Sequence, residues 1–244
     1  MPPPPIGLIM ISRMDRPYVT VSYAQSLDGR IAARDGSSQW ISGPASLRLA
    51  HRLRRDSDAV VVGIETVIRD DPELTYRPGG RRSLARSPSR VVFDSRLRMP
   101  VESKLASTAD EIPTTVFTLK PADGARMEAL KRRGVRIVEC APNPGGGIGV
   151  ADVMERLAAG GCRSVFVEGG GRIITSFLRS GVVDRMLVVT APLIIGAGVE
   201  AVGDLGLRTL AESLRPKRAR TRRLGPDLVW ELLFEPERPG GGRR

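Results

Sequence analysis

The segment from Ser164 to Leu178 (SVFVEGGGRIITSFL) holds the residues whose types and spacing point most directly to ligand chemistry. A buried strand is expected over 164–167, followed by Glu168, three glycines and a helix over 172–179. Glycine lets the backbone approach a ligand closely, and a helix start offers unpaired N–H groups that suit a phosphate. The segment therefore predicts a phosphate site at the carboxyl end of a strand, where open α/β sheets bind ligands. The alternative is a glycine turn without a ligand. The pattern is not the dinucleotide fingerprint GxGxxG followed by an acid, so alone it indicates only a phosphate.

A second strand-to-turn element lies at residues 58–77 (DAVVVGIETVIRDDPELTYR). Gly63 follows the apolar strand expected at 58–62, and Thr66 can offer a hydroxyl. Asp70 and Asp71 precede Pro72 in a sharp turn, for which an ordinary solvated turn is the alternative. Two such elements on one sheet favour a nucleotide crevice more than either does alone.

The third segment, residues 24–43 (AQSLDGRIAARDGSSQWISG), runs from a strand end through small polar residues to Trp40. A tryptophan in a Gly/Ser loop is a candidate to cover an aromatic ring of a ligand. Packing of Trp40 in the core is the equally plain alternative.

The composition allows one domain without a membrane span. The chain has 244 residues, of which 41% are hydrophobic and 4% aromatic, enough for a single α/β core built on aliphatic side chains. No stretch reaches the ~20 apolar residues that span a bilayer. The apolar run at 6–11 follows four prolines and lacks a basic region, so it is a poor signal peptide. We expect a cytoplasmic protein without a membrane partner.

The formal net charge of +11 comes almost entirely from arginine, since lysine occurs only at Lys104, Lys120, Lys131 and Lys217. Arginine forks match phosphate geometry, so an anionic ligand fits, although coding bias and solubility explain most individual arginines. Much of the excess lies in loops and tails, and no nucleic-acid-binding motif accompanies it. We therefore expect no nucleic-acid partner.

Few residues are available for metal or nucleophilic chemistry. Cys140 and Cys162 stand far apart and form no CxxC motif, so neither a disulfide framework nor a zinc site is expected. His51 is the single histidine, which excludes a multi-histidine metal site. A Ser-His-Asp hydrolase would depend on this one residue in the middle of a helix. We expect no metal, and chemistry that belongs to a bound cofactor.

The elements that must position these residues alternate between strands and helices. Residues 1–16 are expected to be a disordered lead-in and 236–244 a disordered tail, with one domain at 17–235. Strands are expected at 18–24, 58–62, 90–94, 114–118, 135–139, 164–167 and 183–190, and helices from 44, at 123–133, 150–159 and 172–179. An antiparallel pair at 217–223 and 228–234 closes the chain, and 77–90 is a polar, mobile insertion. This order predicts a mostly parallel sheet with helices on both faces and an antiparallel C-terminal part.

The three segments together resemble the reductase domain of the bifunctional riboflavin biosynthesis protein and its stand-alone counterparts in fungi and archaea. The matching motifs run in order, from YAQSLDGRIA at 23–32 and SQWISG at 38–43 to HRLRRDSDAVVVGIETVIRDDPELTYR at 51–77, VVFDSRLRMP at 91–100 and VEGGGRIITSFLRSGVVDRMLVVTAPLIIGAG at 167–198. They cover nearly everything from 17 to 235. The zinc motif of the deaminase half is absent, so the resemblance implies reduction only.

The resemblance implies a dihydrofolate-reductase-like fold, with three α/β/α layers around a mixed, mostly parallel sheet, and a homodimer. It implies an NADP-dependent oxidoreductase of the class that acts on CH–OH groups, which uses NADPH to reduce the ribosyl C1′ of a 5-amino-6-(ribosylamino)pyrimidine 5′-phosphate to a ribityl chain. Many bacterial members carry a lysine four residues before the serine of SLDG, where this chain has Ser22. The YAQSLD motif is closer to the stand-alone fungal type.

Site residues follow from the same resemblance. The cofactor is expected to meet Ala24, Trp40, Thr66, Asp70 and Ser95, with its diphosphate on Gly170, Gly171, Arg172, Ile173, Ile174, Thr175 and Ser176. The substrate is expected to meet Ser38, Arg54, Leu74, Arg77 and Glu168, of which the two arginines suit its phosphate.

The implied mechanism is direct hydride transfer from the nicotinamide C4 to C1′ of the open-chain imine or aldehyde, with the protein orienting the two reactants. Glu168 and Asp70 are the catalytic candidates, and either of them or a bound water would deliver the proton. Three alternatives stay open: a same-fold reductase of a folate-like or specialised pterin or pyrimidine, a nucleic-acid-binding protein, and a nucleotide sensor without turnover.

Overall fold

The computed structural model describes residues 16–81, 83–119, 124–143 and 145–234. The predicted tail at 236–244 and the lead-in up to residue 15 lie outside these ranges. Arg16, placed in the lead-in by the sequence, is instead 6% exposed and belongs to the folded domain.

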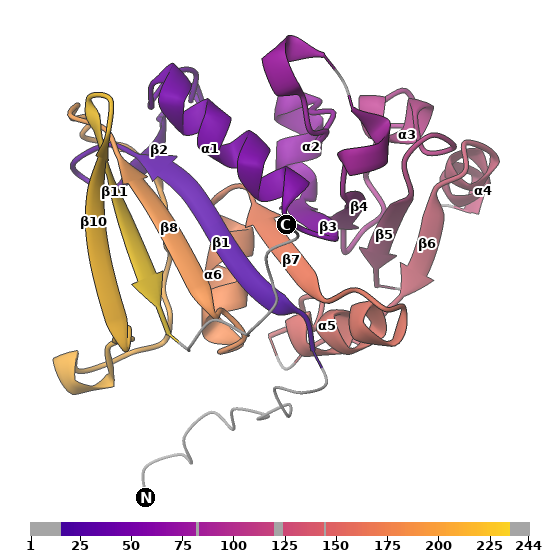
Figure 1. The fold of residues 1–244 in the computed structure, drawn as a ribbon. Helices are drawn as coiled ribbons and strands as arrows, with labels where there is room; N and C mark the ends of the chain where they lie inside the picture. The colour runs from indigo at the N-terminus through magenta and orange to yellow at the C-terminus, as the bar shows by residue number, and fades with distance from the viewer. Residues whose placement is uncertain (1–15, 82, 120–123, 144, 235–244) are drawn as a thin grey trace, which may run out of the picture.

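A nine-stranded sheet runs through the molecule in the order β10-β11-β8-β1-β7-β3-β4-β5-β6 (Figure 1). Its parallel strands are β1 (Tyr18–Gln25), β3 (Ala59–Gly63), β4 (Ser89–Phe93), β5 (Thr114–Thr118), β6 (Arg136–Glu139), β7 (Ser164–Glu168) and β8 (Arg185–Thr190). The hairpin of β10 (Arg218–Leu224) and β11 (Asp227–Leu233) joins antiparallel to β8. The predicted mixed sheet, parallel but for its C-terminal part, is confirmed.

Helices cover both faces of the sheet, which confirms the three predicted layers of a dihydrofolate-reductase-like fold. One core cluster joins the sheet to α1 (Pro44–Arg55), α2 (Ile64–Asp70), the short α3 (Lys104–Ser107) and α4 (Gly124–Arg132). The other joins it to α5 (Val150–Ala159) and α6 (Gly171–Arg179), and α6 lies behind the sheet in Figure 1. Parallel strands covered on both faces read as continuous apolar runs, and in β3 the residues from Ala59 to Val62 are all fully buried.

Several short elements were missed by the sequence analysis. Helix α2 follows β3 directly, and a small two-stranded sheet pairs β2 (Arg30–Ala33) with β9 (Gly198–Glu200). Single 3₁₀ turns lie at Pro78–Gly80 and Leu84–Arg86, inside the predicted polar insertion, and at Leu210–Glu212. Elements of three to seven residues are too short to show a helical or alternating period, so pattern alone does not find them.

A buried ion pair closes the amino-terminal edge of the sheet. The Arg16 guanidinium donates to both carboxylate oxygens of Asp184, at 2.7 and 2.9 Å, and the backbone N–H of Val19 donates to the same carboxylate at 2.8 Å. Asp184 is 4% exposed. The pair therefore fixes the start of β1 beside the residue that precedes β8.

Replacing Asp184 with Asn should destabilise the fold by about 3–5 kcal/mol, because it leaves the Arg16 charge buried without its carboxylate. Denaturant unfolding of the variant measures this change. The control is Glu128→Gln, which removes an exposed partner of Lys131 and should change the free energy of unfolding by less than about 1 kcal/mol. A loss for Asp184→Asn as small as that of the control would contradict the assigned role.

Candidate active site

The parallel strands bring the three predicted segments to one edge of the sheet. Strand β1 lies between β7 and β8, and β3 lies between β7 and β4, so the carboxyl ends of all these strands face the same side. In register, Ser22 is opposite Glu168, and Gly63 is opposite Phe93. Ser22 is 8% exposed, so the position that carries lysine in many bacterial relatives is here a small buried residue beside Glu168.

A bidentate ion pair between Arg54 and Glu168 stands at the centre of this edge. Arg54 Nε donates to Glu168 Oε2 at 2.8 Å, and Nη2 donates to Oε1 at 2.5 Å. Arg54 is 9% exposed, whereas the Glu168 side chain is 25% exposed. The pair therefore holds one carboxylate in a fixed orientation with part of its surface open.

Burial alone would lower the pKa of the Arg54 guanidinium. The attraction and hydrogen bonds of Glu168, helped by the charge of Glu73, more than offset this effect, and the pKa of Arg54 lies above its ordinary value. Arg54 therefore stays charged. Because its guanidinium is bonded to Glu168, Arg54 orients that carboxylate and is less available to bind a substrate phosphate than predicted.

The segment after α2 runs past this pair. Arg54 Nη1 donates to the carbonyl oxygen of Thr75 at 3.2 Å. The Leu74 side chain is 1% exposed and packs in the core cluster that contains α1 and α2, so it is not available to a ligand. The side chain of Arg77 is 37% exposed, with Glu73 at 3.7 Å. Of the two substrate contacts predicted in this segment, Leu74 and Arg77, only Arg77 has a side chain that a substrate could touch.

The three glycines before α6 have different surroundings. A Cβ on Gly171 would lie 2.3 Å from the Glu200 carbonyl oxygen, and one on Gly169 would lie 3.0 Å from Ile173 Cγ2 and 3.5 Å from Thr66 Oγ1. Close packing against backbone thus requires glycine at 171, the fit at Gly169 is tight against a side chain, and Thr66 lies beside the turn. A Cβ on Gly170 would meet nothing within 4 Å, and the backbone there is extended (φ −77°, ψ 171°). The space over Gly170 is open, at a helix start that has no side-chain cap.

The remaining residues of the predicted diphosphate segment divide into core and surface. Ile173 and Ile174 are 6% and 0% exposed, and their side chains pack into the core. The Thr175 hydroxyl donates to the Gly171 carbonyl at 2.6 Å and accepts from Gly203 N–H at 2.9 Å. The Ser176 hydroxyl donates to the Arg172 carbonyl. The groups left to face a ligand are therefore the backbone from Gly170 to Arg172 and the exposed Arg172 side chain.

The other predicted contacts lie around the same edge. Ala24 is on β1, Ser95 follows β4, and Ser38 precedes α1; all three are half-buried. Trp40 is 69% exposed, so it does not pack in the core of this chain. Asp70 ends α2 on the surface, where desolvation by the neighbouring protein atoms raises the pKa of its carboxyl against the opposing charge of Arg69.

The SLDGR motif at 26–30 has a structural role that the sequence analysis did not identify. The Asp28 carboxylate accepts from the Ser26 hydroxyl at 2.6 Å and from the backbone N–H groups of Ile195 and Gly196 at 3.1 and 2.7 Å. These hydrogen bonds, led by that of Ser26, lower the pKa of Asp28 to about 2. The motif thus ties the loop after β1 to the loop after β8.

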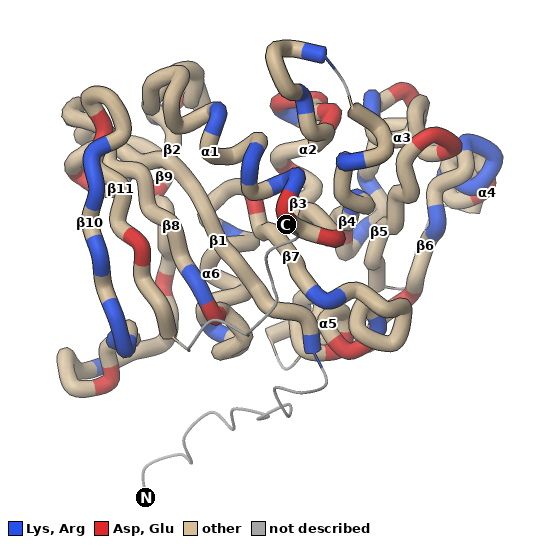
Figure 2. Tube along the Cα trace, viewed as in Figure 1, with Lys and Arg blue, Asp and Glu red and all other residues tan. Residues whose placement is uncertain are grey.

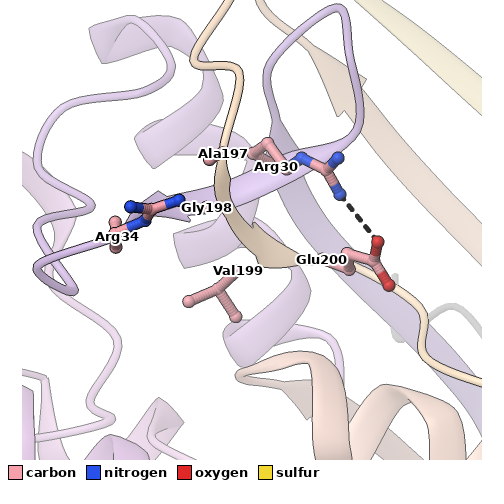
Figure 3. Close-up of a pocket in the computed structure, with 6 residues that line it drawn as sticks. All are labelled: Arg30, Arg34, Ala197, Gly198, Val199 and Glu200. Carbon is pink, nitrogen blue, oxygen red and sulfur yellow. Dashed lines mark hydrogen bonds and ion pairs between the residues drawn. The ribbon is translucent and has the colours of Figure 1, made fainter.

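A shallow hollow of about 310 Å³ lies on the β2–β9 ribbon, lined by Arg30, Arg34 and residues 197–200 (Figure 3). In the figure Arg30 extends toward Glu200, which it meets at 2.9 Å. None of the predicted site residues lines this hollow. Its Glu200 carbonyl oxygen lies close to Gly171.

Comparison with known proteins decides the family. Residues 17–230 match the RibD C-terminal domain family. The chain belongs to this family. It is 37% identical over 228 residues to the 2,5-diamino-6-ribosylamino-4(3H)-pyrimidinone 5′-phosphate reductase of Methanothermobacter thermautotrophicus, a match that covers 90% of this chain and 99% of that protein. The predicted family resemblance is confirmed.

Two-domain relatives are longer. The chain is 40% identical over 215 residues to the riboflavin biosynthesis protein RibD of Aquifex aeolicus, covering 88% of this chain and 57% of that one. The structure of Acinetobacter baumannii RibD superposes with a TM-score of 0.76 at 28% identity, covering 90% of this chain and 58% of that one. The riboflavin biosynthesis reductase Rib7 of Saccharomyces cerevisiae, 24% identical, shares the fold with a TM-score of 0.69 over 89% of this chain and 90% of that one. The chain thus spans little more than half of RibD.

Two matched substitutions separate the roles of neighbouring glycines. Gly171→Ser should destabilise the fold by about 1–3 kcal/mol, because its Cβ meets the Glu200 carbonyl at 2.3 Å. Gly170→Ser should leave stability unchanged or raise it by a few tenths of a kcal/mol, since serine is a good N-cap and finds open space. Thermal and denaturant unfolding measure both variants. Equal losses of stability at the two positions would contradict this division.

Proposed function

We propose that this chain catalyses the NADPH-dependent reduction of the ribosyl group of a (di)amino-6-(5-phosphoribosylamino)pyrimidine(di)one to the ribityl form, in riboflavin biosynthesis. The observation that carries the proposal is a partly open carboxylate, Glu168, fixed by Arg54 at one end of a glycine turn whose other end is an uncapped helix start. The name of the Methanothermobacter relative, which aligns over nearly its full length, supports the same reaction.

The cofactor site fits a dinucleotide diphosphate. The open space over Gly170 lets an anion approach the first N–H groups of α6, where the helix dipole favours negative charge. Thr66 lies beside Gly169 and would offer a hydroxyl, and the exposed Arg172 would offer a positive charge. Trp40, Ala24 and Ser95 are proposed contacts at the same edge of the sheet. When bound, the reduced nicotinamide supplies the hydride.

Glu168 is assigned to orienting the substrate. Each carboxylate oxygen already accepts one charge-assisted hydrogen bond from Arg54, so the group acts as a strong acceptor for amine or hydroxyl donors of the substrate. Arg77, with its partly exposed guanidinium, would hold the 5′-phosphate, and Ser38 is a further proposed contact.

The proton must reach the nitrogen or oxygen that gains electrons when C1′ accepts the hydride. Both carboxylate oxygens of Glu168 are bonded to Arg54, so we assign the proton transfer to one of the other two candidates, Asp70 or a bound water. Desolvation raises the pKa of Asp70, in the direction that favours a proton carrier.

The decisive assay is NADPH oxidation with the phosphorylated ribosylaminopyrimidine, set against dihydrofolate and against NADH. We expect turnover of the pyrimidine with NADPH. Glu168→Gln should lower kcat/KM by about 100-fold, because the charge-assisted contacts to the substrate are lost. The matched control is Glu139→Gln on the distant strand β6. Turnover of dihydrofolate alone, or an effect of Glu168→Gln no larger than that of the control, would refute the assignment.

We also propose a cytoplasmic homodimer. Among the described residues, no helix combines the length and the apolar character that a membrane span needs.

Large apolar side chains are exposed near the C-terminal hairpin: Leu207, Leu210, Leu214 and, on β11, Trp230 at 42%. The outer strand β10 carries a row of arginines (Figure 2), which discourages edge-to-edge strand pairing. A second copy would therefore dock on the apolar side chains and leave the strand edge free.

Light scattering coupled to size-exclusion chromatography should give twice the chain mass for the wild type. Trp230→Glu should shift the protein toward monomer, because it places a charge in the proposed apolar interface. Arg220→Glu, on the exposed face of the neighbouring strand, is the control and should stay dimeric. A wild-type monomer at micromolar concentration would overturn this proposal without touching the catalytic one.

A further inference from the structure

Two buried nitrogen atoms beside the proposed substrate site have unused hydrogen-bonding capacity. His51 Nδ1 and Arg77 Nε are each shielded from solvent, and neither has a hydrogen-bond partner within the part of the chain that the structure describes. Buried polar atoms in folded proteins are almost always paired, so two unpaired atoms in one neighbourhood call for an explanation.

The two residues come from different elements that meet at the Arg54–Glu168 pair. His51 lies one turn before Arg54 on α1, and the two side chains therefore share a face of the helix. The backbone of Thr75, two residues before Arg77, lies close enough to the imidazole to affect its pKa. The segment that contacts the ring is thus the one that carries Arg77.

Charge and chemistry make the two unpaired atoms complementary. Desolvation lowers the pKa of His51, and the positive charges of Arg54 and Arg77 lower it further, against the opposing effects of the Glu168 carboxylate and the Thr75 hydrogen bond. The ring is therefore neutral at pH 7. In the neutral tautomer that carries its proton on Nε2, Nδ1 has a lone pair and is an acceptor, whereas the arginine Nε–H is a donor.

The exposed part of Arg77 is its far end. The side chain is 37% exposed while its Nε is buried, so the open surface belongs to the terminal guanidinium nitrogens. Within the described residues Arg77 forms an ion pair with Glu73 at 3.7 Å, longer than a charge-assisted hydrogen bond. The guanidinium is thus loosely held and able to turn toward an anion.

We propose that His51 is a positioning residue for substrate binding: its neutral ring accepts, through Nδ1, a hydrogen bond from Arg77 Nε–H, directly or through one bound water, and so aims the guanidinium at the substrate's phosphate. This role rests on the proposed function, because it assumes a phosphorylated substrate. The single histidine of the chain thereby has a role for which its ring must be uncharged.

Because the chain has one histidine, imidazole NMR on untagged, ¹⁵N-histidine-labelled protein reads this site directly. At pH 7 we expect an unprotonated Nδ1, a pKa below 6.5, and a change in the Nδ1 resonance on addition of ribose 5-phosphate. Arg77→Met should abolish that change. Arg52→Met, which removes an exposed arginine from the same helix, should preserve it. A protonated Nδ1, or a ribose 5-phosphate response that survives Arg77→Met, overturns the proposal.

Steady-state kinetics separate positioning from a merely structural role. His51→Gln keeps an amide nitrogen near the position of Nε2 but loses the Nδ1 acceptor, and should raise KM for the phosphorylated pyrimidine about tenfold or more with kcat little changed. His51→Asn, whose amide oxygen replaces Nδ1, should restore KM. In the wild type KM should rise as the pH falls through the lowered pKa, because an imidazolium cannot accept and repels Arg77; His51→Gln should flatten this rise.

The outcomes distinguish this inference from the proposed function. A wild-type enzyme that reduces the pyrimidine while His51→Gln matches it in KM refutes the role of His51 alone. A wild-type protein that fails to reduce the pyrimidine refutes the proposed function, and the NMR response to ribose 5-phosphate then still decides whether His51 and Arg77 act together on a phosphate ester.

Discussion

The ion pair between Arg54 and Glu168 is the constraint around which the candidate site is organised. Removing two charges from water is costly, and only good geometry with further hydrogen bonds repays that cost. Here the pair is bidentate, and Arg54 has a third contact at the Thr75 carbonyl. One guanidinium thereby links helix α1, strand β7 and the segment after α2, three parts of the chain that are far apart in sequence.

Close packing and ligand access are assigned to different glycines among three consecutive residues. Gly171 is needed because a Cβ there would lie 2.3 Å from the Glu200 carbonyl oxygen of β9, and a Cβ on Gly169 would be tight against Ile173 of α6. Gly170 lies between them in an ordinary backbone conformation with free space above it. Contacts at Gly169 and Gly171 hold the turn in place. An anion at the start of α6 would therefore meet N–H groups that are already oriented toward it.

The sequence predicted well whatever depends on local pattern. Runs such as Ala59–Val62 and the strand before Glu168 identified the sheet and the edge where its parallel strands end. The sequence did not predict which side chains of an element point toward the candidate site and which point into the core. Leu74, Ile173 and Ile174 fall within matching motifs, yet their side chains support the core, and spacing alone does not show which way they point. The carboxylate of Asp28, by contrast, bonds to a loop 167 residues away, and nothing local signals that contact.

Helix α1 shows how the antiparallel end of the sheet serves the parallel part. At its start the carboxylate of Asp227, on β11, accepts from Gly43 N–H at 2.9 Å and from the Ser46 hydroxyl at 2.8 Å. A carboxylate there satisfies a free N–H group and complements the helix dipole. At its other end Arg54 bonds to Glu168 on β7. The helix that carries His51 and Arg54 is therefore fixed at both ends by carboxylates from two strands of one sheet. Both anchoring carboxylates, Asp227 and Glu168, belong to one rigid sheet. The separation of β11 from β7 in that sheet therefore sets the position of the site residues on α1.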